Sequence, residues 1–171
     1  MAWTDRPANL DKPGHIPKGD ELEATLDQIA ALTAAGWTDI SSTYVVGAVT
    51  TPPTKGSSTY NVRYRRSAGA DLVHFEFRIL IDATWAGAPG SGVYRFPAPF
   101  NASASAILCA NGAGYVFDNG TANRACVVRF ENAGNLNVYN DGGASALTHA
   151  GSGTAWATGD IISGSIAYEP A

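Results

Sequence analysis

The fold of this chain is decided by two neighbouring stretches, Thr59–Arg66 (TYNVRYRR) and Asp71–Asp82 (DLVHFEFRILID). In both, aromatic or branched apolar residues alternate with polar ones, which is the pattern of a strand buried on one face. The residues between them, Ser67–Ala70, have the small and flexible character of a turn. The pair therefore predicts an antiparallel hairpin with one apolar and one polar face.

Further short strands are expected around this hairpin, separated by sequences rich in Gly, Asn and Pro. Because no helical pattern interrupts them, they predict a mainly β protein, a jelly-roll β-sandwich of about 8–10 antiparallel strands. The expected strands are Thr43–Val49, Val93–Phe96, Ala104–Ala110, Gly114–Phe117, Arg124–Glu131, Asn135–Asn140 and Ile161–Tyr168. Turns are expected at Asn111-Gly112, Asp118–Gly120 and Asn132–Gly134, and a loop is expected over Thr84–Gly92.

The chain divides into an N-terminal anchor region, residues 1–36, and a β-sandwich head, residues 37–171. The anchor begins as an extended arm and continues as one expected helix, Glu21–Ala35, with Asp20 as its N-cap and Gly36 at its end. A helix of about 15 residues is marginally stable alone, so we expect it to pack against copies of itself or a larger assembly. The candidate assembly residues are Trp3, Leu22, Leu26, Ile29 and Leu32.

Composition excludes several classes of partner. The formal net charge is −4, from 11 basic and 15 acidic residues, so the chain lacks the overall positive field that favours nucleic acid. No apolar stretch approaches the roughly 20 residues of a membrane helix. The N-terminus lacks the apolar core of a signal peptide, which predicts synthesis in a cytoplasm. Cys109 and Cys126 are expected on strands, as free buried thiols or as a disulfide.

No set of catalytic residues can be nominated. The three histidines, His15, His74 and His149, lie far from one another and from the cysteines, so no zinc-ligand spacing is present. Glu76 is expected to form a cross-strand ion pair with Arg63 or Arg65 rather than to act in catalysis. We therefore expect a non-enzymatic protein with no metal and no cofactor.

Aromatic residues in or beside loops are the best candidates for ligand or interface contacts. Aromatic rings near Asn and Asp stack on sugar faces and also anchor protein interfaces. The alternative is that each ring packs beneath its own loop. The candidates are Trp85, Tyr94, Tyr115, Tyr139 and Trp156. Rings expected in the core are Tyr60, Tyr64, Phe75, Phe77, Phe96, Phe117 and Phe130.

Several short motifs together suggest a family. From Trp37 to Tyr168 the chain resembles the β-sandwich head domains of tail-associated and receptor-binding proteins from actinobacterial bacteriophages and prophages. The motifs that carry this resemblance are Tyr60–Tyr64 (YNVRY), Phe75–Arg78 (FEFR), Gly92–Pro97 (GVYRFP), Trp156–Asp160 (WATGD) and Ile166–Tyr168 (IAY).

The resemblance implies a jelly-roll head like those of complement and tumour-necrosis-factor proteins, assembled as a homotrimer on a virion. It implies a virion structural protein, assembled in the host cytoplasm, that other capsid or tail proteins hold through residues 1–36. Host-surface carbohydrate is the candidate ligand. Two alternatives remain: a capsid or tail decoration (cement) protein with a purely clamping role, and a carbohydrate-binding module.

Overall fold

The computed structural model describes residues 36–67, 72–120, 122–140, 145–147 and 155–171. The expected helix and the candidate assembly residues lie outside these ranges: Glu21–Ala35, Trp3, Leu22, Leu26, Ile29 and Leu32. The division into an anchor region and a head therefore stays a prediction.

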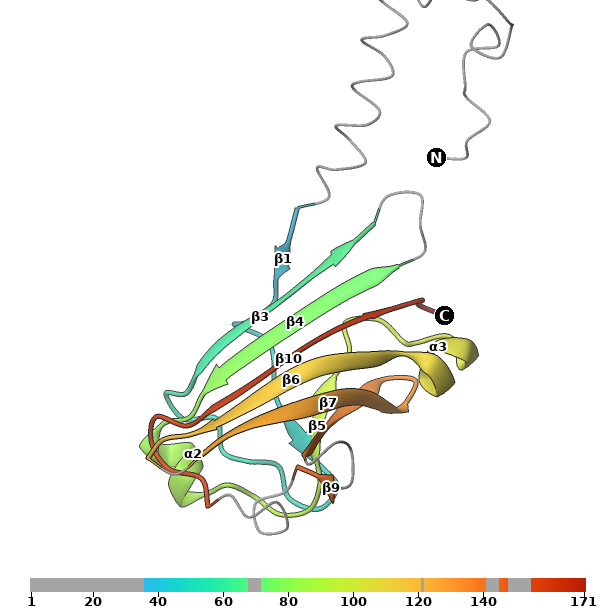
Figure 1. The fold of residues 1–171 in the computed structure, drawn as a ribbon. Coiled ribbons are helices and arrows are strands. Elements are labelled where there is room, and N and C mark those ends of the chain that lie inside the picture. Colours follow the sequence, from blue (N-terminus) through green and yellow to red (C-terminus); the bar gives the residue numbers. More distant parts are fainter. Residues whose placement is uncertain (1–35, 68–71, 121, 141–144, 148–154) are drawn as a thin grey trace, which may run out of the picture.

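The described residues are mainly β, as the sequence predicts, and their strands form one curled antiparallel sheet (Figure 1). The strand order is β1-β3-β4-β10-β6-β7-β8-β5-β2, and β9 pairs with β8. The strands are β1 (Thr38–Asp39), β2 (Gly47–Ala48), β3 (Thr59–Arg66), β4 (Val73–Leu80), β5 (Tyr94–Pro97), β6 (Asn111–Asp118), β7 (Ala122–Asn132), β8 (Asn135–Asn140), β9 (Ser145–Ala146) and β10 (Ile161–Tyr168).

The last strand returns to the middle of this sheet. Strands β6, β7 and β8 follow one another as neighbours, and β10 then lies between β4 and β6. Three consecutive strands with a fourth that returns beside the first form a Greek key. The long strands β3, β4, β10, β6 and β7 consequently run side by side across one face of the molecule (Figure 1).

The predicted hairpin of β3 and β4 is confirmed, and its register places Tyr60 opposite Ile79 and Val62 opposite Phe77. Tyr60, Val62, Phe75 and Phe77 are buried, whereas Asn61, Arg63 and Arg65 of β3 face outward. The alternation of apolar and polar residues in the sequence therefore predicts which face of the sheet packs on the core.

Aromatic contacts show how the sheet curls. Phe77 of β4 stacks on Phe96 of β5, with ring centroids 4.7 Å apart. Along the sheet, β10, β6, β7 and β8 separate these two strands. Phe77 and Phe96 can meet only if the sheet folds back on itself and encloses the core between its two halves. Tyr44 closes the same core by packing on Phe75.

Two helices replace segments for which we expected other structures. The expected strand Ala104–Ala110 is wrong: this segment forms the helix α3 (Ala104–Cys109). Ser103 caps it, its hydroxyl accepting a hydrogen bond from the N–H of Ala106 at 3.2 Å. Three of the residues over 104–110 are alanine, the best helix former, and with the serine cap they outweigh the β-forming tendency of Ile107.

The loop expected over Thr84–Gly92 includes the helix α2 (Ala83–Gly87), which brings Trp85 into the core. The turn expected at Asn111-Gly112 is also wrong, because these residues begin β6. Gly112 is required there for space: a Cβ would overlap the carbonyl oxygen of Ser165. The turn at Asp118–Gly120 is confirmed, and Gly120 has φ +94°.

Asp82 ties α2 to the start of the hairpin. Its carboxylate accepts hydrogen bonds from the N–H of Trp85 at 2.9 Å, the N–H of Ser57 at 2.7 Å and the hydroxyl of Ser58 at 2.9 Å. These hydrogen bonds lower the pKa of Asp82 from its ordinary value of 3.8, and the bond from the N–H of Trp85 has the largest effect.

We therefore expect acid to destabilise the protein partly through Asp82. A carboxyl whose pKa is lower in the folded than in the unfolded state stabilises the fold above the unfolded pKa, and this contribution is lost as pH falls through the folded pKa. The Tm of Asp82→Asn, measured from pH 7 to pH 3, should be lower at pH 7 and should fall less steeply than the wild-type Tm below 3.8. Equal steepness in the two proteins would contradict this role.

Among the described residues, no helix combines the length and apolar character that crossing a membrane requires.

Candidate binding groove on the outer sheet face

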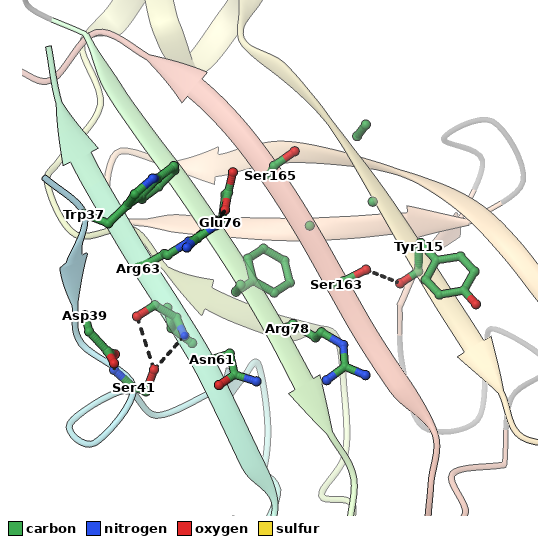
Figure 2. A pocket seen from close by; sticks show the side chains of 15 residues that line it. Trp37, Asp39, Ser41, Asn61, Arg63, Glu76, Arg78, Tyr115, Ser163 and Ser165 are labelled. Atoms are coloured by element: carbon green, nitrogen blue, oxygen red, sulfur yellow. Dashed lines mark hydrogen bonds and ion pairs between the residues drawn. The ribbon is translucent and has the colours of Figure 1, made fainter. Parts of the chain in front are cut away.

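A shallow groove of about 850 Å³ crosses the outer face of the sheet over β1, β3, β4, β10 and β6 (Figure 2). The side chains that line it alternate along each strand with residues that point into the core. The groove is therefore a consequence of the same alternation that builds the fold.

Strand register places the outward side chains in two rows across this face. The first row runs from Asn61 on β3 through Arg78 on β4 and Ser163 on β10 to Tyr115 on β6. Figure 2 shows these four side chains in that order on adjacent strands. Each step across an antiparallel sheet is roughly 4.8 Å, so Arg78 and Tyr115 are separated by about 10 Å with only a serine between them.

The second row contains an ion pair. Arg63 lies opposite Glu76, and Ser165 and Ala113 continue the row on β10 and β6. Arg63 Nη2 lies 2.9 Å from Glu76 Oε2, with the two side chains 52% and 39% exposed. The cross-strand pair predicted for Glu76 is thus confirmed, with Arg63 as the partner. At this exposure the pair contributes little to stability.

Small residues make the surface hollow. Strands β10 and β6 present Ser163, Ser165 and Ala113 outward, between the long side chains of β4 and the ring of Tyr115. Ser163 is held in place because its hydroxyl donates to the carbonyl of Tyr115 at 3.2 Å. A ligand can therefore approach the backbone of β10 more closely than that of its neighbours.

Glycines thin the floor further. Gly164 on β10 lies opposite Gly114 on β6; the ring of Phe77 fills the space beneath Gly164, and Val128 lies beneath both glycines. A Cβ on Gly164 would lie 2.5 Å from Phe77 Cζ and 2.8 Å from Val128 Cγ2. The groove and the core are separated at this point by a single layer of backbone.

Arg78 is the cation that this groove leaves unpaired. Its side chain is exposed and makes no hydrogen bond or ion pair with any residue that the structure describes. The side-chain amide of its neighbour Asn61 is likewise without a protein partner within the described ranges. Both side chains are therefore available to an incoming polar group.

Trp37 and Asp39 form the end of the groove at β1. The guanidinium carbon of Arg63 lies 4.4 Å from the Trp37 ring centroid, and that of Arg65 lies 5.1 Å from it. Asp39 accepts a hydrogen bond from the N–H of Ser41 at 2.8 Å, and hydrogen bonding from Ser41 lowers the pKa of Asp39. Charge at this end is thus already paired or hydrogen-bonded.

Tyr115 forms the opposite end. Its side chain is 38% exposed, its ring stacks on Phe117 at 6.5 Å, and its hydroxyl donates to Asn123 Oδ1 at 3.4 Å. Phe117, which we expected in the core, instead lies on the outward face of β6 beside Tyr115. The cause is register: Val116 takes the buried position, so its neighbours must face outward.

The structure separates the five candidate aromatics. Trp85, Tyr94 and Trp156 are buried, which contradicts the expectation that they contact a ligand or an interface. They form one cluster, with centroids 6.0 Å apart for Trp85 and Tyr94 and 6.1 Å apart for Tyr94 and Trp156. Burial raises the pKa of Tyr94 to about 12. Only Tyr115 lines the groove; Tyr139 is half-buried on β8, near Arg129.

The groove also includes residues that we did not nominate from the sequence: Trp37, Asn61, Arg78, Ser163 and Ser165. The outward positions of β3 and β4 were predictable from their alternation. Their proximity to Ser163 and Tyr115 was not, because it depends on β10 lying between β4 and β6.

A second, smaller hollow of about 280 Å³ shares Glu76, Ala113 and Ser165 with the groove and extends along the strands to His74 and Asn111. The polar surface is therefore longer than a single small molecule. In the described part of the chain, no three His, Cys, Asp or Glu residues are grouped so that they could hold a metal ion.

The fold and the groove define a mainly β protein with an open, polar surface across one sheet face. The sequence matches no protein-family model, and no significant match was found among curated proteins or solved structures.

Proposed function

We propose that this chain is a non-enzymatic structural protein of a bacteriophage virion, in which residues 37–171 form a displayed head that binds host-surface glycan. The observation that carries the glycan-binding role is the open groove with amide, hydroxyl and guanidinium groups along its length and an aromatic ring at each end. Sugars present hydroxyl groups at their edges and C–H groups on their faces, and polar side chains and aromatic rings match these two surfaces.

In the proposed assembly, residues 1–36 hold the head on the capsid or tail and help to form a homotrimer. The Greek key and the antiparallel strands support a jelly-roll description of the head. Three weak sites on one trimer would bind a repetitive surface far more strongly than one site, because each binding event raises the effective concentration of the next.

A role as a decoration protein is the second candidate, and exposed apolar residues favour it. Leu108 is 85% exposed, Val45 59% and Val49 52%. Apolar side chains left in water are candidates for contact with a neighbouring subunit. They lie on α3 and beside β2, away from the groove.

Two measurements test the proposal. Light scattering after size-exclusion chromatography should give three times the chain mass of 17.7 kDa, and a monomer at all concentrations would overturn the trimer. Fluorescently labelled full-length protein should bind intact actinobacterial cells and lose this binding when surface polysaccharide is removed. Binding to phage particles with none to cells would instead support the decoration role.

A further inference from the structure

The unpaired guanidinium of Arg78 suggests the charge of the ligand. Each other charged group that lines the groove has a partner: Arg63 pairs with Glu76, and the Asp39 carboxylate accepts a hydrogen bond from the N–H of Ser41. The charged side chains that line the groove are Asp39, Arg63, Glu76 and Arg78, and their net formal charge is zero. Among them, only Arg78 has no hydrogen-bonding or ionic partner within the described residues. An anionic group on the ligand would complete the pairing.

We propose that the row Asn61, Arg78, Ser163 and Tyr115 binds a uronic-acid residue within an acidic polysaccharide. This inference rests on the proposed glycan-binding function and specifies its substrate class. The Tyr115 ring stacks against the face of the sugar, Arg78 pairs with the carboxylate, and the Asn61 amide and Ser163 hydroxyl bond to neighbouring oxygens. Guanidinium groups match carboxylates well because two parallel N–H bonds can form.

The spacing favours a carboxylate attached to a sugar ring over a phosphate in a flexible chain. Arg78 and Tyr115 are about 10 Å apart across the sheet, with only Ser163 between them. A uronic acid carries its carboxylate directly on the sugar ring. A single sugar unit can therefore contact both Arg78 and Tyr115 across the small side chain of Ser163. A polymer of alternating phosphate and open-chain alcohol has no ring to place on Tyr115 beside its charge.

Glu76 is an opposing charge two residues from Arg78 on the same face of β4. Its Oε2 atom accepts two hydrogen bonds from Arg63, one from Nε–H at 3.0 Å and one from Nη2–H at 2.9 Å. That pairing leaves the Arg78 guanidinium free but retains a negative charge near the site. We therefore expect Glu76→Gln to strengthen anion binding, since it removes this charge and releases Arg63.

The length of the surface favours a polymer. The smaller hollow continues from Glu76, Ala113 and Ser165 towards His74 and Asn111, in the direction of the strands. A polysaccharide lying along β10 would place one uronate at Arg78 and further residues over this second hollow.

The test is isothermal titration of the full-length protein with oligogalacturonate and with the same oligosaccharide after methyl esterification, which removes the charge and keeps the rings. Arg78→Gln should weaken oligogalacturonate binding about tenfold, which is the effect expected for the loss of one charge-assisted hydrogen bond. Binding of the methyl ester should stay within about twofold of the wild-type value. Arg95→Gln is the matched control, because Arg95 lies on β5, in the other half of the curled sheet, and lines neither the groove nor the smaller hollow. It removes the same charge and should change neither affinity.

The aromatic contact is tested separately. Tyr115→Ala should weaken both ligands by about tenfold, whereas Tyr115→Phe should retain most of the binding, because stacking needs the ring and not the hydroxyl. Thermal melts of all variants confirm that the fold is kept.

The outcomes distinguish the inference from the function on which it rests. Equal binding of acid and ester, or an Arg78→Gln protein that binds as the wild type does, would overturn the uronate site while glycan binding stands. Tighter binding of a phosphate polymer such as poly(glycerol phosphate), lost in Arg78→Gln, would also overturn it. Failure to bind cells or any saccharide would overturn the proposed function itself.

Discussion

Replacing Asp160 by alanine is expected to lower the free energy of unfolding by about 3 kcal/mol, because two backbone N–H groups would lose the carboxylate oxygens that accept their hydrogen bonds. Asp160 is fully buried. Its Oδ1 accepts from the N–H of Asn119 at 2.8 Å, and its Oδ2 accepts from the N–H of Ala157 at 2.7 Å. One side chain thus joins the turn after β6 to the turn before β10.

Chemical denaturation of Asp160→Ala and Asp160→Asn measures this effect. The asparagine keeps the volume and one acceptor oxygen but turns an amide N–H₂ towards the second donor, so its loss of stability should lie between those of wild type and alanine. Thr158→Ala, an exposed change in the same turn, is the control and should change the free energy of unfolding by less than about 0.5 kcal/mol. A loss below about 1 kcal/mol in Asp160→Ala would contradict the role given to the carboxylate.

Features that depend on neighbouring residues were predictable from the sequence. The alternation in Thr59–Arg66 predicts both the strand and the faces of its side chains, and the hairpin then brings Arg63 opposite Glu76. The turn character of Gly159-Asp160 has the same local origin, since Gly159 has φ +96° and Asp160 follows it as a side-chain acceptor. In each case a short-range preference and the final fold agree.

Features that depend on distant strands were not predictable. Trp85, Tyr94 and Trp156 lie in or beside loop sequences, yet the curl of the sheet and α2 place all three rings in one buried cluster. The groove has the same long-range origin. Arg78 and Tyr115 become neighbours across Ser163 only because the last strand enters the sheet between theirs, which no local pattern indicates.

Phe77→Ala should have the largest effect on stability, a loss of about 4 kcal/mol, because it removes a buried ring and leaves a cavity. Phe77 packs against Phe75 at 5.8 Å and stacks on Phe96 at 4.7 Å, so it joins the two halves of the curled sheet. It also fills the space under Gly164 at the floor of the groove. The same ring therefore supports the core and the binding surface.

A double-mutant cycle with Gly164→Ala isolates this second contact. In the wild-type background the added methyl group meets Phe77 Cζ at 2.5 Å within a closed core, and overpacking should cost about 2 kcal/mol. In the Phe77→Ala background that clash is gone, so the same change should cost at least about 1 kcal/mol less. Free energies from urea denaturation of the four proteins give this coupling. Additive losses would mean that the ring does not support the floor at Gly164, and the groove would then keep its shape independently of the core beneath it.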